Sequence, residues 1–201
     1  MIDVKQITQL HRDMVAHWHE HEVDNPCEGF LGIVCRQFSY NFLLWHEEDV
    51  ARSREVGDAR IAEVKRAIDR YNQLRNDWIE KIDDYITGEL LECRVAPAVD
   101  APLNTETPGS VIDRLSILAL RIYHMEEQAG RKELSAEQIA SVEQKLAVCL
   151  AQHDDLSLSL FELLRDIFAG QKQHKTYHQM KMYNDPMLNP YLYRAKKRLA
   201  G

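Results

Sequence analysis

Residues 30–57 read FLGIVCRQFSYNFLLWHEEDVARSREVG, and this stretch decides the fold class. Its apolar side chains recur every three to four residues, at Leu31, Val34, Phe38, Phe42 and Trp45. Because an α-helix makes one turn in 3.6 residues, these side chains share one helix face. The stretch ends at a glycine, which commonly terminates helices. The pattern therefore predicts a long amphipathic helix over residues 30–56.

The same periodicity continues on both sides of this stretch. It predicts four further helices, over residues 2–22, 59–91, 107–128 and 136–169. At the start of one of them Thr107 precedes Pro108, an order typical of a helix N-cap followed by the first helical residue. At the start of another, Ser135 stands three residues before Gln138, which is the spacing of a capping box.

Two segments lack this periodicity. Residues 95–107 contain Pro97 and Pro102 and are predicted to form the main loop. Residues 171–201 contain several tyrosines, whose large rings favour packing of this tail on the bundle. The sequence therefore predicts an all-α, single-domain bundle of about five long helices over residues 1–201, with a packed C-terminal tail.

Composition limits the classes of function. A chain of 201 residues with 45% hydrophobic residues can bury an ordinary core. The net charge of -7 repels a phosphate backbone, so nucleic-acid binding is disfavoured. The four cysteines lack the spacing of a metal site and are expected to be reduced. No secretory signal or apolar run of about 20 residues is present, which predicts a cytoplasmic protein without membrane insertion.

Polar residues interrupt the apolar stripes of two predicted helices. In residues 30–56 the stripe continues through Asn41, Glu48 and Arg52, and in residues 59–91 it continues through Asn72 and Arg75. Buried amides and charges are costly unless they find partners. These side chains should therefore either meet one another in a network that fixes helix register or face a solvated pocket, and the sequence leaves both interpretations open.

Two short segments share a histidine pattern. Residues 44–49 and 122–127 both read aliphatic, aromatic, His, any residue, Glu and an acid. His46 and His124 each precede an acid by three residues, so each pair projects from one helix face and could share a cation or a proton. A histidine beside an aromatic residue is, however, more often a hydrogen-bonded interior residue than a metal ligand.

Four carboxylates suggest a site for a hard cation such as Mg²⁺ or Mn²⁺: Glu48, Asp49, Glu80 and Asp83. Their arrangement on two consecutive helices is similar to that of all-α nucleotide pyrophosphohydrolases, although only Glu80 and Asp83 fit one of the two motifs of those enzymes, ExxD. A ferritin-like di-iron site would need Glu before His, which is the reverse of the order here. No Gly-rich phosphate loop, GxSxG elbow or Cys–His motif is present, which disfavours nucleotide-fold and nucleophilic enzymes.

Longer motifs resemble one known family. They comprise Asn41 with residues 44–52, and residues 68–77, 104–115 and 181–185, and they are similar to an uncharacterised bacterial family, domain of unknown function four-two-five-four. The resemblance covers nearly the whole chain. The family has no established activity, cofactor or catalytic residue, so the resemblance implies none. Its motifs and the polar stripes together indicate a set of candidate ligand-binding residues: Asn41, His46, Glu48, Arg52, Asp69, Asn72, Arg75, Asp113, Arg114 and His124.

The preferred hypothesis is a polar pocket between the second, third and fourth helices that binds a small anionic metabolite such as a nucleotide or a sugar phosphate. Arginine forks suit anionic oxygens, and asparagine or aspartate suits hydroxyl groups. The hypothesis extends to hydrolysis of that ligand with Mg²⁺ or Mn²⁺, but the sequence does not decide whether the chain is an enzyme. The alternative is a non-enzymatic interaction or scaffold protein whose polar residues only specify packing, and a homo-oligomer is compatible with either.

Overall fold

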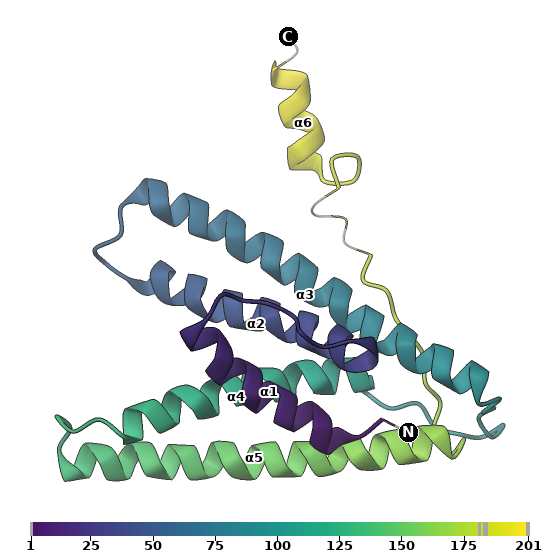
Figure 1. The fold of residues 1–201 in the computed structure, drawn as a ribbon. Coiled ribbons are helices and arrows are strands. Elements are labelled where there is room, and N and C mark those ends of the chain that lie inside the picture. Colours follow the sequence, from purple (N-terminus) through teal and green to yellow (C-terminus); the bar gives the residue numbers. More distant parts are fainter. Residues whose placement is uncertain (1, 181, 183–184, 200–201) are drawn as a thin grey trace.

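The computed structural model describes residues 2–180, 182 and 185–199, and these ranges contain six α-helices (Figure 1). They are α1 Val4–Glu20, α2 Gly29–Arg52, α3 Asp58–Glu92, α4 Pro108–Ala129, α5 Ala136–Phe168 and α6 Pro190–Leu199. The described part of the chain contains no β-strand, only an isolated bridge between Leu103 and Gln173. The predicted all-α fold is therefore confirmed.

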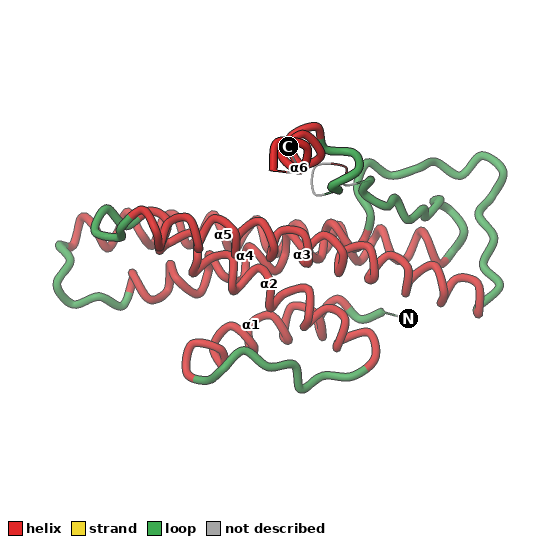
Figure 2. The backbone as a smooth tube through the Cα atoms, turned by 90° about the horizontal axis from the view of Figure 1, so that it is seen from above, coloured by secondary structure: helices red, strands yellow, loops and turns green. Residues whose placement is uncertain are grey.

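The five longer helices form two hairpins and a covering helix. α2 packs against α3, and α4 packs against α5, with the turns of both hairpins at the left of Figure 1. α2 also contacts α4, so the two hairpins lie side by side in one layer. Figure 2 shows α1 on one face of that layer, where it contacts α2, α4 and α5.

Local sequence explains where the helices begin and end. Thr107 and Ser110 form a capping box at the start of α4, with Pro108 as the first helical residue. Ser135 and Gln138 form the predicted capping box of α5. α2 ends at Arg52, earlier than the periodicity predicted, because Ser53 leaves the helix in an extended conformation. Both predicted N-termini are thus confirmed, and one C-terminus is corrected.

The apolar core lies between α1 and the layer. Trp18 of α1 packs against two rings of α2, with centroid distances of 5.1 Å to Phe38 and 5.4 Å to Phe42. Fully buried Leu115 of α4 and Leu160 of α5 complete this cluster. Each such side chain contributes about 1.5–3 kcal/mol on burial. This packing fixes the rotation of α2 about its axis, because its apolar face must contact α1. The polar residues of α2 therefore point away from α1.

The C-terminal tail packs on the bundle only in its first part. The backbone N–H of Gln173 donates to Pro102 O at 3.0 Å, and His174 Nε2 lies 3.0 Å from Asp83 O. α6 instead extends away from the bundle, and the Tyr191 side chain is exposed (Figure 1). The resemblance motif at residues 181–185 lies largely outside the described residues. None of the described helices has the length and apolar character that a bilayer span requires.

Gly109 permits a close contact between α3 and α4. A Cβ atom there would lie 2.7 Å from the carbonyl oxygen of Ile79 and 2.9 Å from the Asp83 carboxylate. The Gly109 backbone N–H donates to Asp83 Oδ1 at 2.8 Å, so this carboxylate also caps the start of α4. By contrast, a Cβ atom at Gly88 of α3 would meet no atom within 4 Å.

Two alanine substitutions should therefore change stability in opposite directions. We expect Gly109→Ala to lower the free energy of unfolding by about 1–3 kcal/mol, because two helices must separate to admit the methyl group. We expect Gly88→Ala to raise it by roughly 0.5–1 kcal/mol, because alanine loses less backbone entropy than glycine in a helix. Urea unfolding of the two variants and the parent measures both changes. Equal effects of the two substitutions would contradict the close contact.

His11 is the most deeply buried titratable side chain of α1. Its ring packs on Phe38 with a centroid distance of 4.8 Å, and neither ring nitrogen has a hydrogen-bond partner within the described part of the chain. Burial lowers the pKa of His11 from 6.5 to about 3, and repulsion from His153 adds to the shift. The folded protein therefore holds a neutral ring at pH values where the unfolded chain takes up a proton.

This depressed pKa predicts an acid-sensitive core. As the pH falls below 6.5, the unfolded chain gains the proton first, so stability is lost until the pH reaches about 3. Between pH 7.5 and 5.5 we expect His11 to account for a loss of about 1.4 kcal/mol. Urea unfolding of the parent and of His11→Leu at both pH values measures this loss, since every other histidine is present in both proteins. Identical pH dependence of the two proteins would disprove this role of His11.

Candidate ligand pocket between α2, α3 and α4

A pocket of about 380 Å³ lies between α2, α3 and α4. Its polar lining consists of residues from the predicted set, namely Asn41, Glu48 and Arg52 of α2 with Asn72 and Arg75 of α3. Each group recurs at helical spacing on one face, and the two helices pack against each other along their length. The remaining lining is apolar and comes from Leu44, Trp45, Ile117 and Leu120.

The two arginines that line this pocket form ion pairs with nearby carboxylates. Arg52 lies 3.6 Å from Glu48 and 3.1 Å from Asp49, and its side chain is exposed at the rim. Arg75 is more enclosed, with 27% of its side chain exposed. Arg75 pairs with Asp113 of α4 at 3.6 Å, so both arginines have carboxylate partners.

A buried hydrogen-bond network centred on Asp113 of α4 lies beside the pocket. Asp113 Oδ1 accepts hydrogen bonds from Gln37 Nε2 at 2.7 Å and from Asn41 Nδ2 at 2.8 Å. The Asn41 amide also lies 2.8 Å from Ser116 Oγ, which itself donates to the Asp113 carbonyl. Burial raises the pKa of Asp113, while Arg75 and the two amides act in the opposite direction. The network joins α2 to α4 in a fixed register.

Arg75 connects this network to the pocket. Its Nε atom lies 3.6 Å from Asp113 Oδ1, which is an ion pair but too long for a hydrogen bond. Among the described residues, this buried Nε atom has no hydrogen-bond partner. The guanidinium group lines the pocket, and the Asp113 carboxylate behind it limits its movement.

Of the four residues in this network, the sequence singles out Asn41 and Asp113 but not Gln37 and Ser116. Gln37 stands four residues before Asn41, and Ser116 stands three residues after Asp113, so each shares a helix face with a predicted residue. Both side chains are buried at positions where the periodicity calls for apolar residues. That mismatch is the signal that could have identified them.

The two predicted histidines lie outside the pocket lining and form a cluster with a third. The ring centroid of His19 of α1 is 5.3 Å from that of His46 and 5.0 Å from that of His124. Burial lowers the pKa of His46, and its two histidine neighbours lower it further. Trp45 stacks on His124 at 5.0 Å and also lines the pocket, so it connects the two regions. His19 was missed because nothing in the sequence relates α1 to the later motifs.

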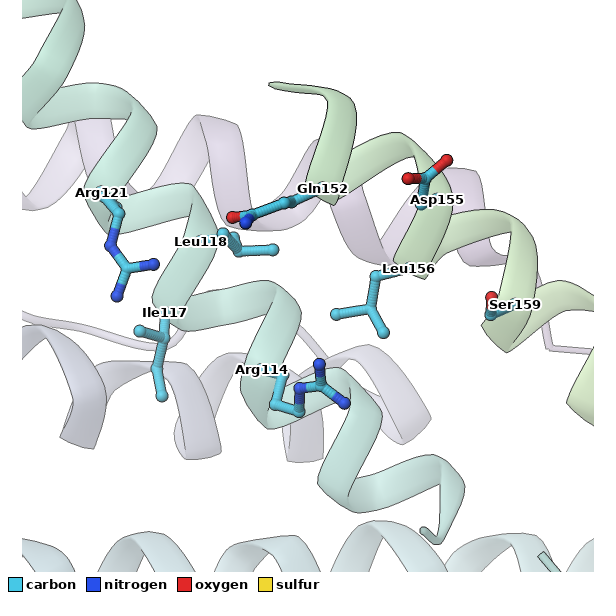
Figure 3. Close-up of a pocket in the computed structure, with 8 residues that line it drawn as sticks. All are labelled: Arg114, Ile117, Leu118, Arg121, Gln152, Asp155, Leu156 and Ser159. Carbon is cyan, nitrogen blue, oxygen red and sulfur yellow. The ribbon is translucent and has the colours of Figure 1, made fainter. Parts of the chain in front are cut away.

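Two other predicted residues do not reach this pocket. Asp69 is exposed and pairs with Lys65 of the same helix at 2.7 Å. Arg114 pairs with Glu106 at 2.8 Å and lines a different pocket, between α4 and α5 (Figure 3). Helical periodicity predicts the face of a helix on which a residue lies only approximately. Neighbouring faces of one helix contact different partners, so a small error in the face places a residue outside the pocket.

The predicted carboxylate cluster for a cation does not form. Glu48 and Asp49 pair with Arg52, whereas Glu80 accepts hydrogen bonds from the tail and Asp83 caps α4. Glu48 lies near the start of α3, where its charge helps to raise the pKa of Lys65. Glu80 lies roughly 20 Å further along α3, since an α-helix rises 1.5 Å per residue. Within the described ranges, no group of three or more His, Cys, Asp or Glu residues has the geometry to hold a metal ion.

Comparison with known proteins agrees with the resemblance of the sequence motifs. The model of one family, described as a protein of unknown function, DUF4254, matches residues 31–176. This range runs from the first turn of α2 to beyond the end of α5 and so contains every residue that lines the pocket. No curated protein and no solved structure matches the chain. Because the match covers more than half of its length, the chain belongs to the DUF4254 family.

Proposed function

We propose that the pocket between α2, α3 and α4 binds a small anionic metabolite, such as a nucleotide or a sugar phosphate. The observation that carries this proposal is the partly enclosed guanidinium group of Arg75, which lines the pocket and forms no hydrogen bond among the described residues. A guanidinium group offers paired N–H donors that match the oxygens of a phosphate. A bound phosphate would accept hydrogen bonds from the side of this guanidinium group that faces the pocket.

The rest of the lining supports a ligand with polar and flat parts. Asn41 and Asn72 carry amides that suit hydroxyl or carbonyl groups, and Trp45 provides an aromatic surface for a ring. The volume of about 380 Å³ lies within the range typical of small-molecule sites. These features favour a metabolite over an inorganic ion alone.

The proposal concerns binding and does not extend to hydrolysis. Glu48 is the one carboxylate that lines this pocket among the described residues, and the other three acids of the predicted cation site lie elsewhere. Metal-dependent hydrolysis of a phosphate generally needs several oxygen ligands around the cation. The geometry therefore provides support for ligand recognition and none for that reaction.

One observation favours the alternative of a scaffold protein. The network of Asp113 with Gln37, Asn41 and Ser116 is buried and joins two helices, as polar groups that specify register do. In that case Arg75 would serve only as the counterion of Asp113. The two functions predict different effects of neutralising the charges.

Single neutralisations should abolish ligand binding and leave the fold intact. We expect both Arg75→Met and Glu48→Gln to remain folded, with the larger decrease in Tm in Arg75→Met because Asp113 loses its counterion. In a thermal-shift screen of nucleotides, sugar phosphates and nucleotide sugars, a ligand at 100 times its Kd should raise the parent Tm by about 5–10 °C. We expect Arg75→Met to remove this response.

The matched control is Arg66→Met, an exposed arginine on the same helix and outside the pocket, which should keep the full response. The scaffold alternative predicts the reverse pattern. It requires that Arg75→Met lower the free energy of unfolding by roughly 3–5 kcal/mol, and that an apolar residue at Asp113 in the same variant restore it. It also requires that no ligand raise the Tm of the parent. That combination would overturn the proposed binding function.

Removing the Asp113 carboxylate should destabilise the fold whichever function holds. Asp113→Ala leaves two buried amides without their acceptor and Arg75 without its counterion, so we expect a loss of about 3–5 kcal/mol. Asp69→Ala on α3 removes an exposed ion pair with Lys65 and should lower the free energy of unfolding by less than about 1 kcal/mol. Urea unfolding of the two variants measures both losses. A similar small loss in the two variants would show that the network does not stabilise the fold.

A further inference from the structure

Two free thiols lie together where the loop between α1 and α2 meets the start of α2 (Figure 1). Cys27 belongs to the loop and is half-buried, whereas Cys35 of α2 is fully buried. Both side chains pack in the apolar core beneath α1. Neither residue lines the pocket of the proposed function, so this pair of thiols concerns a separate property of the chain.

One side chain holds the loop against the first two turns of α2. Asn25 Nδ2 donates to the carbonyl oxygen of Gly32 at 2.9 Å, and Asn25 Oδ1 accepts from the Cys27 backbone N–H at 3.3 Å. Gly32 permits this approach, because a Cβ atom there would lie 2.6 Å from the carbonyl oxygen of Cys27. Cys35 stands three residues after Gly32 and so lies on the same face of α2. The backbone thus brings Cys27 beside the helix face that carries Cys35.

The two thiols are close enough to interact through a hydrogen bond. Burial raises the pKa of Cys35 to about 12, and the charge of Cys27 and this hydrogen bond add to the shift. Cys35 therefore keeps its proton and is shielded from solvent, whereas the partly exposed Cys27 meets dissolved reagents first. Such a pair suits a two-step thiol oxidation, in which an accessible sulfur reacts and a neighbouring sulfur resolves the product.

We propose that Cys27 and Cys35 are a redox modification site, which forms a reversible disulfide bond in the presence of a hydroperoxide. In the first step the sulfur of Cys27 attacks the hydroperoxide, so that an S–O bond forms and the O–O bond breaks. The leaving oxygen takes the thiol proton and departs as water or an alcohol. In the second step the sulfur of Cys35 displaces the hydroxyl group from Cys27. An S–S bond forms, the S–O bond breaks, and the hydroxide leaves as water with the proton of the Cys35 thiol.

Together the two thiols lose two electrons, which reduce the hydroperoxide. The disulfide bond ties the loop to the second turn of α2 and thereby fastens the connection through which α1 joins the layer of hairpins. A dithiol reductant reverses the modification by thiol–disulfide exchange. Because the hydroxide takes the proton of Cys35 as it leaves, the high pKa of this thiol does not prevent the second step.

Peptide mapping after treatment of the whole protein with hydrogen peroxide tests this proposal. Trypsin cleaves after Arg12 and Arg36, and the peptide 13–36 between them contains both cysteines and no other cleavage site. After oxidation we expect this peptide to lack two hydrogen atoms and to resist N-ethylmaleimide, and dithiothreitol should restore both sites of alkylation. Exposed Cys93 reports that the oxidant has acted.

Two glycine variants separate pairing guided by the fold from chance oxidation. Gly32→Ala should slow formation of the bond at least about fivefold, because the methyl group moves the Cys27 backbone away and disulfide geometry tolerates little displacement. Gly88→Ala is the matched control, since a Cβ atom there meets nothing within 4 Å, and should react at the rate of the parent. Circular dichroism verifies that both variants remain folded.

Cys93→Ser should form the bond as the parent does, since Cys93 lies at the end of α3 and outside the pair. The proposal is overturned if both cysteines of the peptide 13–36 remain open to alkylation after Cys93 has been oxidised. Addition of oxygen to Cys27 without loss of the two hydrogen atoms would also overturn it, because Cys35 would then not resolve the product. Equal rates in the two glycine variants would have the same consequence.

Discussion

The buried carboxylate of Asp113 is the constraint on which the arrangement of α2, α3 and α4 depends. A charge removed from water is tolerated only where donors replace the lost hydration. Here the donors come from Gln37 and Asn41 on α2, and the counterion comes from Arg75 on α3. A shift of any of the three helices along its axis would break one of these contacts. The network thereby holds Arg75 at the wall of the pocket.

Apolar packing of α1 complements this polar constraint. Trp18 contacts Phe38 and Phe42, and these rings define the side of α2 that faces the core. Because successive helical residues rotate by about 100°, the stripe with Asn41 and Glu48 then faces α3 and α4 instead. The apolar and polar halves of α2 thus have different partners. This division gives α2 one defined orientation in the bundle.

The arginines of the pocket between α2, α3 and α4 are held in ion pairs. Arg52 pairs with Glu48 and Asp49, and Arg75 pairs with Asp113. With a net charge of -7 on the whole chain, long-range attraction of an anion contributes little to binding. Recognition of a small anion in this pocket would therefore rest on close hydrogen bonds to the guanidinium group of Arg75 and not on general attraction of polyanions.

The helices can be predicted from local sequence patterns, because apolar periodicity and capping residues such as Thr107 and Ser135 act within a few residues of chain. The polar stripe with Asn41 and Arg75 can be predicted in the same way, since polar residues on an apolar helix face stand out in the sequence. Which of these side chains meet depends on how the helices pack. Helical spacing defines a face but not its partner, so Glu48 and Glu80 looked alike in sequence although they lie far apart on the bundle. Contacts between residues of different helices depend on how the helices pack, and a local sequence pattern does not contain this information.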